Sequence, residues 1–242
     1  MLLLAACDGG GATTPGSAQS LVRVAHFVPD LPDTVPGLDL RVNVAMPAGY
    51  ARASFGTVTP FVEAPVATTQ VSAQFAPSTS ADAPLPFALS GRLNLAARTR
   101  HTFLLVGLWR GGQADFPGFT VLVSDTAAVA TTSTRLTAVH ASPGVDGGID
   151  VYLLPPGTMA VPALATPAVG SVGFRTGRSA LVSSGSYAVV ATRVGDRSVV
   201  LARQDPVTFA GGGAATVFLY GLPPGPGVQA ARTIALRVTD DR

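Results

Sequence analysis

The sequence has only one cysteine, Cys7, and charged residues occupy just 12% of its 242 positions. A single cysteine excludes an internal disulfide, so apolar packing and hydrogen bonds have to hold the fold. Apolar residues account for 47% of the chain, whereas disordered chains are poor in apolar residues and rich in charge. No apolar stretch approaches the roughly 20 residues of a membrane-spanning helix. The composition therefore predicts a folded chain without such a helix.

Lysine is absent, and all sixteen basic residues are arginine. Arginine binds phosphate through its planar fork, which would suit a polyanion-binding surface. However, the net charge is only +2, and the arginines are scattered, whereas nucleic-acid binders cluster them on one face. A GC-rich genome explains the arginines, together with the abundant Ala, Gly and Pro. We therefore predict no nucleic-acid partner.

Glycine and proline are abundant, with 27 and 20 residues. Both disfavour helix interiors, by roughly 1 and 3 kcal/mol, and between apolar runs they mark turns that join short strands. Apolar and polar residues alternate with a period of two in segments 38–44 and 149–153, as expected for strands with one apolar face. Segments 187–191 and 198–201 flank Gly195-Asp196, which predicts a hairpin.

The first residues contain Leu4-Ala5-Ala6-Cys7, which matches the bacterial lipobox. In lipoproteins the signal is cut before the cysteine and the thiol is lipidated; stable anchoring takes more than one acyl chain. A full signal has a basic start and an apolar stretch of about 7–15 residues, so we interpret residues 1–7 as a truncated signal, either because the true start codon lies further upstream or because this is a truncated form. Polar, Gly-rich residues 8–20 predict a flexible tether. Cys7 is thus the predicted lipidation site; the alternative is an internal methionine followed by a buried thiol.

The rest of the chain contains two copies of one unit, in the same order and offset by about 114 residues. The clearest match aligns segments 21–29 and 136–143 on His26 and His140. A unit of this size is too long for a solenoid repeat and fits a whole domain. The other matching segments are 38–42 with 149–153, 54–58 with 171–175, 93–95 with 207–209, 102–108 with 216–222, and 119–125 with 234–240.

These copies predict two domains, residues 21–126 and 135–242, joined by a linker at 127–134. Short strands that each have one apolar face must stack two sheets to bury both faces. We therefore predict an all-β fold with two tandem immunoglobulin-like antiparallel β-sandwich domains.

Two segments of the second copy, Val139-His140-Ala141-Ser142-Pro143 and Ile149-Asp150-Val151-Tyr152, carry a family resemblance. They resemble the bacterial domain-of-unknown-function family numbered 4397, as do segments 170–173 and 185–187. The first copy departs from the pattern, with Phe27-Val28 where Ala-Ser is usual. The resemblance extends over about residues 21–242. It implies secreted or lipid-anchored envelope proteins with immunoglobulin-like sandwiches, often in tandem, and implies no biochemical activity.

His26 and His140 are the first candidates for chemistry, because histidine binds metals and transfers protons. Both share strand parity with apolar residues, whereas the nearby carboxylates Asp39 and Asp150 lie on the polar parity of their strands. We therefore predict that each ring has a structural role and bonds a loop backbone group.

A calcium site is the second candidate, since Asp30, Asp33, Asp146 and Asp150 lie between the first two strands of each unit. Calcium needs about 6–8 oxygen ligands. The spacing does not match the EF-hand, and Asp is an ordinary turn residue. We predict no metal site.

Nucleophilic and phosphate-binding motifs are also lacking. Segment 170–173 is not a G-x-S-x-G elbow, and no motif indicates the carboxylate pair of a glycosidase. Segment 211–213 is Gly-Gly-Gly, which we interpret as a hairpin turn between Phe209 and Val217. We therefore predict no catalytic residue and no cofactor.

An aromatic segment near residue 110 is the candidate recognition loop. Trp109, Arg110, Phe116 and Phe119 lie in or beside it, and exposed aromatic residues anchor interfaces. The alternative is that these rings pack at the rim of a core.

These observations favour a non-enzymatic cell-envelope lipoprotein that presents two β-sandwich modules for adhesion, scaffolding or partner binding. Its predicted partners are the membrane, through the lipid anchor, and an envelope protein or glycan. The predicted location is the periplasmic face of the inner or outer membrane, or the cell surface. One alternative is a small-molecule or lipid carrier, which predicts an apolar cavity between sheets or domains. The other is an envelope hydrolase, which predicts a deep polar pocket with a perturbed titratable group.

Overall fold

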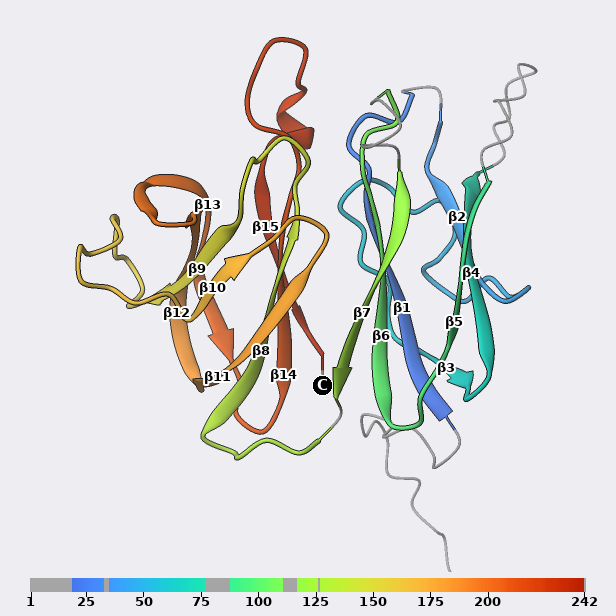
Figure 1. The fold of residues 1–242 in the computed structure, drawn as a ribbon, viewed down its shortest axis with the longest axis horizontal. Helices are drawn as coiled ribbons and strands as arrows, with labels where there is room; N and C mark the ends of the chain where they lie inside the picture. The colour runs from blue at the N-terminus through green and yellow to red at the C-terminus, as the bar shows by residue number, and fades with distance from the viewer. Residues whose placement is uncertain (1–18, 33–34, 77–87, 111–116, 126, 242) are drawn as a thin grey trace, which may run out of the picture.

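The computed structural model describes residues 19–32, 35–76, 88–110, 117–125 and 127–241 (Figure 1). Within these residues every regular element is a strand, apart from the short 3-10 turn η1 (Ala230–Arg232). The strands form four sheets, which group into two β-domains. The all-β prediction is therefore confirmed.

The first domain consists of two sheets, named A and B. In spatial order, sheet A contains β3 (Val62–Pro65), β1 (Gln19–Phe27), β6 (Thr99–Val106) and β7 (Gly118–Asp125). Sheet B contains β2 (Leu38–Val42), β4 (Thr68–Phe75) and β5 (Ala88–Asn94).

The second domain repeats this arrangement in sheets C and D. Sheet C contains β11 (Gly177–Ser183), β8 (Ser133–Ala141), β14 (Ala214–Tyr220) and β15 (Ala235–Asp240). Sheet D contains β10 (Val169–Val172), β9 (Ile149–Leu154), β12 (Gly185–Arg193) and β13 (Asp196–Phe209). In the first domain a single bridge between Leu38 and Ala53 stands where β10 pairs with β9. The two domains therefore share one strand order.

Sheets A and C are mixed, so the prediction of purely antiparallel sandwiches was wrong. The strand β1 runs parallel to β6, and β8 runs parallel to β14, while the other pairs are antiparallel. Parallel neighbours need a long crossover connection. Here the crossover is the excursion that builds sheet B or sheet D before the chain returns to the first sheet.

The four sheets stack in the order B, A, C, D, with an apolar layer between each neighbouring pair (Figure 1). In β1, Val22 and Val24 face sheet B, whereas Ala25 and Phe27 face sheet C. The strands β1, β6, β8 and β14 are therefore buried on both faces. Successive side chains of these strands point to opposite faces. One face packs in the core of its own domain, and the other packs in the layer between the domains.

The layer between the domains contains an aromatic cluster. Phe27 lies 5.2 Å from Phe218 and 4.8 Å from Tyr220, measured between ring centroids. Phe55 also contacts Tyr220, with ring centroids 5.4 Å apart. Buried aromatic pairs at such distances add stability beyond their area of contact. The two domains thus pack against each other through a dry layer rather than meeting only at a linker.

The hairpin predicted at Gly195-Asp196 is confirmed, because β12 and β13 pair with Arg193 opposite Asp196. The hairpin predicted at segment 211–213 was wrong. The strands on its two sides, β13 and β14, belong to different sheets, so this segment crosses from sheet D to sheet C. Gly212 donates its N–H to Ala130 and Ser133 carbonyl oxygens, which fixes the crossing against the segment that joins the domains.

One pair of matched segments also needs correction. The hydrogen bonds of His26 with Gly56 and Thr57 recur in the second domain as those of His140 with Arg175 and Thr176. Segments 54–57 and 173–176 are therefore the structural equivalents, rather than 54–58 and 171–175. The sequence match on Ser and Gly placed this segment two residues too early, because the two loops differ in length.

Candidate functional site

His26 and His140 are both fully buried. In each ring Nδ1 accepts a hydrogen bond from a backbone N–H two residues further along, from Val28 at 3.4 Å and from Ser142 at 3.3 Å. The predicted structural role, in which the ring bonds a loop backbone group, is confirmed. Because a backbone N–H only donates, the neutral ring carries its proton on Nε2. Both Nε2 atoms are buried and have no hydrogen-bond partner.

Both rings are neutral at ordinary pH. Burial lowers the pKa of His26 to about 3 and that of His140 to about 4, because a low-dielectric interior disfavours the charged imidazolium. At His140 the nearby Val145 backbone opposes this fall in pKa. Burial is the cause of the lowered pKa of His26.

Two of the acidic residues weighed in the sequence hold turns. Asp39 accepts the backbone N–H of Arg52 at 3.0 Å, and Asp150 accepts those of Ser171 at 2.9 Å and Gly195 at 3.1 Å. Arg52 and Ser171 have φ angles of 49° and 54°, a conformation that is uncommon for residues other than glycine. Asp39 and Asp150 are each only 7% exposed, because these turns cover the polar face of their strands.

Asp30 organises the start of the candidate recognition loop. Its two carboxylate oxygens accept the backbone N–H groups of Trp109 at 2.6 Å and Arg110 at 2.7 Å. The Trp109 ring packs edge-on against Phe75, with centroids 5.4 Å apart, and lies at the border of the first core. The Arg110 side chain is exposed. The tryptophan is therefore part of the core rim, and only the arginine of this pair faces solvent.

Phe119 lies in β7 and packs against Phe103 at 6.2 Å, so it also borders the first core. Phe116, Asp33 and the predicted lipidation site Cys7 lie outside the described residues. The structure therefore places Trp109 and Phe119, two of the four predicted loop residues, beside the core.

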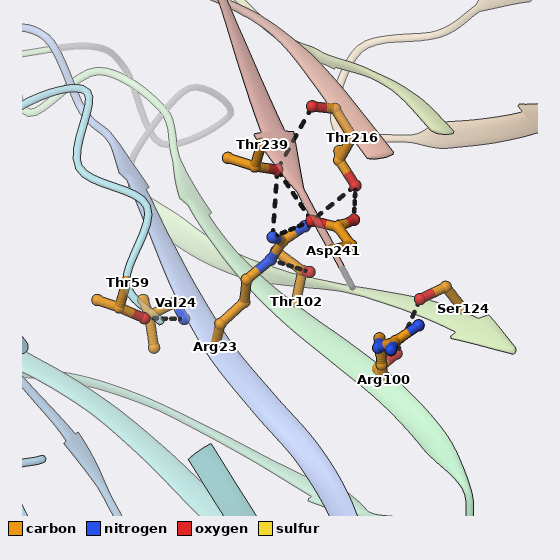
Figure 2. Close-up of polar contacts among 9 residues, drawn as sticks. All are labelled: Arg23, Val24, Thr59, Arg100, Thr102, Ser124, Thr216, Thr239 and Asp241. Carbon is orange, nitrogen blue, oxygen red and sulfur yellow. Dashed lines mark hydrogen bonds and ion pairs between the residues drawn. The ribbon is translucent and has the colours of Figure 1, made fainter. Parts of the chain in front are cut away.

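A buried polar cluster joins the two domains (Figure 2). Arg23 of β1 makes a two-point ion pair with Asp241, in which Nη1 is 2.5 Å from Oδ1 and Nη2 is 3.2 Å from Oδ2. Its remaining three N–H groups bond the hydroxyls of Thr102 at 2.9 Å, Thr216 at 3.0 Å and Thr239 at 3.2 Å. All five guanidinium donors are thus satisfied. We name these five residues the interdomain clamp.

Aromatic rings complete the surroundings of Arg23. The guanidinium carbon lies 4.4 Å from the centroid of Phe61 and 5.5 Å from that of Phe218. A guanidinium over an aromatic face gains cation–π energy, which is greatest when water is excluded. Arg23 and Asp241 are almost inaccessible to solvent, so the clamp combines a charge pair, hydrogen bonds and apolar cover.

The clamp uses equivalent residues of the two domains in unequal ways. Thr102 stands opposite Arg23 in the β1–β6 pair, and Thr216 stands opposite Thr137 in the corresponding β8–β14 pair. The two equivalent threonines therefore both bond one arginine, whose own counterpart is Thr137. The Arg23–Asp241 ion pair therefore has no equivalent at Thr137.

The sequence interpretation missed Arg23, although a signal was present. Arg23 shares strand parity with Ala25 and Phe27, so the second face of this strand is apolar around one charge. A solvated face would carry more polar residues. That pattern indicates a covered face with a buried arginine, which needs a carboxylate partner.

A second group of arginines fixes a long loop over sheet D. Arg197 donates to the Tyr152 hydroxyl at 3.3 Å and to the Ala163 carbonyl, and Arg203 donates to the Thr158 carbonyl. The loop, residues 155–168, covers the outer face of sheet D, on the side away from the first domain (Figure 1). We name it the outer loop.

The outer loop carries two large apolar side chains into solvent. Met159 is 85% exposed and Leu164 is 96% exposed. Val200 of β13 is also exposed and lines the same surface hollow as Met159. Exposed apolar groups that stand together on a fixed frame are typical of interaction sites.

The described residues contain no group of three or more His, Cys, Asp or Glu side chains placed to hold a metal ion. They also contain no helix that is long and apolar enough to cross a membrane.

Fold and site define a class of protein: an all-β chain of two like domains, joined through a dry layer with a charged clamp. Comparison with known families identifies the family of the chain. The family described as "Domain of unknown function (DUF4397)" matches residues 20–152, and the chain belongs to this family. The match covers the first domain and continues through β8 into β9 of the second. No curated protein matches the chain.

Proposed function

We propose that this protein is a non-enzymatic cell-envelope lipoprotein that presents two immunoglobulin-like modules as one rigid unit for binding an envelope protein. The observation that carries the proposal is the interdomain clamp. Arg23 of the first domain bonds Thr216, Thr239 and Asp241 of the second, and such contacts restrain the orientation of one module relative to the other. The second module is then a second copy of the family domain.

The outer loop supports the same proposal. Its backbone is held by Arg197 and Arg203, while Met159 and Leu164 project into solvent. A partner that covers these side chains gains apolar contact without having to order the loop, which lowers the entropy cost of binding. The recognition surface would thus lie on sheet D, away from the first domain.

Photo-cross-linking in intact cells tests this proposal. A photoreactive residue is placed at Leu164, and the matched control carries it at Leu181, an exposed apolar residue on the edge strand β11 of the same domain. We expect one discrete protein adduct from position 164 and none from 181. Absence of an adduct at 164, or the same adducts from both positions, would contradict the proposal.

The lipid anchor is a separate part of the proposal and rests on Leu4-Ala5-Ala6-Cys7. We expect mass spectrometry of protein from the native host to find an N-terminal peptide that begins at an acylated Cys7. The Cys7→Ser variant should move from the membrane fraction to the soluble fraction. An unmodified Cys7, or a mature protein that starts well after it, would refute the anchor.

A further inference from the structure

Sheet B has an outer face that points away from the second domain (Figure 1). Its inner face packs in the first core through residues such as Leu40, Val71 and Leu93. Because successive side chains of a strand alternate between faces, the residues between them point outward. These outward residues carry hydrogen-bonding or charged groups: Asp39 and Arg41 of β2, Thr68, Gln70, Ser72 and Gln74 of β4, and Ser90, Arg92 and Asn94 of β5.

The charges that this face presents to solvent are positive. The charged residues of the three strands are Asp39, Arg41 and Arg92. Asp39 is only 7% exposed, and its carboxylate accepts the Arg52 backbone N–H. By contrast, Arg41 is partly exposed and Arg92 is exposed. A ligand on this face therefore meets two guanidinium groups, while the one carboxylate of these strands is covered.

The strand register fixes the spacing of the two arginines. Arg41 stands opposite Ser72, and Ser72 stands opposite Ser90, which is two residues from Arg92. Neighbouring strands lie about 4.8 Å apart and each residue adds about 3.4 Å, so the two arginine Cα atoms are about 12 Å apart on one face. Hydroxyl groups fill the row between them. One small anion is too short to reach both guanidinium groups.

Glutamine side chains of the central strand β4 stand beside both arginines. The Gln74 amide oxygen accepts hydrogen bonds from Arg41, at 2.8 Å from Nε and 3.3 Å from Nη2. Gln70 Oε1 lies 3.5 Å from Arg92 Nη2. A guanidinium has five N–H donors, so these contacts orient Arg41 and leave donors of both arginines for a ligand. A group that is already oriented loses less entropy when it binds.

The chemistry of the face restricts the ligand. A guanidinium pairs with a planar carboxylate through two parallel N–H···O bonds, and the Ser72 and Ser90 hydroxyls and the Gln70 amide can bond alcohol groups. Helices that dock on lipid add apolar side chains that enter the bilayer, and protein interfaces centre on aromatic anchors. The outward residues named above supply neither. An extended polymer that repeats carboxylates and hydroxyls fits them best.

We propose that the outer face of sheet B binds an acidic polysaccharide of the uronate type. Its carboxylates pair with Arg41 and Arg92, and its hydroxyls bond the polar row between the two arginines. This surface is independent of the partner-binding surface proposed on sheet D, because sheets B and D are the opposite outer layers of the molecule (Figure 1).

The test uses two probes of nearly one shape on the full chain. A purified oligogalacturonate carries the carboxylates, and its fully methyl-esterified form removes their charge. We expect isothermal titration calorimetry to show saturable binding of the oligogalacturonate. The ester should bind at least about tenfold more weakly, the worth of one hydrogen bond between charged groups. Binding should also weaken between about 0.1 M and 1 M salt, as the screening length falls from about 10 Å to 3 Å.

A charge-matched pair of variants locates the site. Arg41→Gln/Arg92→Gln should weaken oligogalacturonate binding at least about tenfold, since it removes both charged partners. Arg178→Gln/Arg193→Gln removes two exposed arginines of the second domain and lowers the net charge equally, so its affinity should stay within about twofold, because distant exposed charges are screened. Equal losses in the two double variants would mean that net charge alone attracts the polymer, which would overturn the proposal.

A further variant keeps the test decisive if Arg41→Gln/Arg92→Gln does not fold. Ser90 is exposed, so Ser90→Glu adds a repelling carboxylate beside the two arginines and should also weaken binding at least about tenfold. Gln229→Glu, at an exposed position of the second domain, is the control and should not change it. No binding of the oligogalacturonate, equal affinity for its ester, or capture of phosphatidylglycerol vesicles in its place would contradict the proposal.

Discussion

Arg23 contributes both to the stability of the fold and to the contact between the two domains. Removing one member of a buried ion pair costs about 3–5 kcal/mol, because the other charge is left without compensation in the interior. We expect Arg23→Met and Asp241→Asn each to lower the free energy of unfolding by about that amount, and the double variant to lose much less than the sum. The measurement is a double-mutant cycle from chemical denaturation.

The matched control for this cycle is the pair Arg203–Asp205, whose atoms approach to 2.6 Å but whose side chains remain 22% and 18% exposed. The corresponding cycle should give a coupling of about 1 kcal/mol or less, since solvent screens exposed pairs. Equal coupling energies in the two cycles would mean that the clamp contributes no more than a surface ion pair.

The buried histidines predict how stability depends on pH. The pKa of His140 falls from 6.5 to about 4 on folding, so between these values the unfolded chain binds more protons than the folded chain. Stability therefore rises with pH in this window and is lost as pH falls through it, by up to about 1.4 kcal/mol per pH unit for one histidine. Urea denaturation at several pH values between 7.5 and 4.5 measures this slope.

The variant His140→Gln should flatten that slope by one proton, because it removes one group that charges only in the unfolded chain. Its stability relative to the natural protein should improve as the pH falls. If the pH profiles of the two proteins run parallel, the burial of a neutral His140 ring is wrong.

The role of a residue could be predicted from the sequence where that role depended only on the pattern within one strand. The parity of His26 with Val22 and Val24 indicated a buried ring, and the ring is buried. The roles of Arg23 and Asp39 depend on groups far along the chain, such as Asp241, or on a turn conformation. Neither appears in the alternation of a single strand, so these roles had to come from the structure.

At the scale of elements, segment 211–213 gives the sharpest steric prediction. A Cβ on Gly211 would lie 1.6 Å from the Thr131 carbonyl oxygen, which is backbone and has little freedom to move. We expect Gly211→Ala to lower the free energy of unfolding by about 1–3 kcal/mol or more, as for overpacking elsewhere. Chemical denaturation measures the loss.

Gly225→Ala provides the control, since a Cβ at Gly225 meets nothing within 4 Å. That variant should unfold within about 0.5 kcal/mol of the natural protein, as surface substitutions usually do. Equal effects of the two alanines would indicate that the contact with the joining segment does not restrain the crossing.

Strand positions were largely predictable, because the period of two and the Gly and Pro turns mark them directly. Pairing direction was not predictable, since β1 meets β6 only after the chain has built sheet B. The same limit explains the error at segment 211–213, where a glycine turn joins two sheets instead of two neighbours. Local sequence specifies that the chain turns, and tertiary packing decides where it goes next.

At the scale of the whole molecule, the dry layer predicts that the two domains unfold together. Ala25 faces this layer, so Ala25→Arg places an unpaired charge in it. We expect the natural protein to unfold in one thermal transition and Ala25→Arg to unfold in two, and small-angle X-ray scattering of the variant to show a larger radius of gyration. Leu181→Arg, at an exposed position, should change neither. A single unchanged transition in Ala25→Arg would show that the domains are not coupled through this layer.

The apolar layer between the two domains was the part of the architecture that the sequence interpretation left out. Duplication predicted two like domains, and it placed their strands in the same order. It did not predict that the outer faces of β1 and β8 pack against each other. In a chain with so few charges, apolar residues on the second face of a strand look like ordinary sequence variation.

The two domains contact each other through equivalent strands, β1 with β6 on one side and β8 with β14 on the other. Such an isologous contact consumes the same patch on both partners, so none is left over for a further module. A longer relative with three or four copies would have to form separate pairs of domains joined by linkers, instead of one continuous stack of domains. Gene duplication in this family would then favour even numbers of modules.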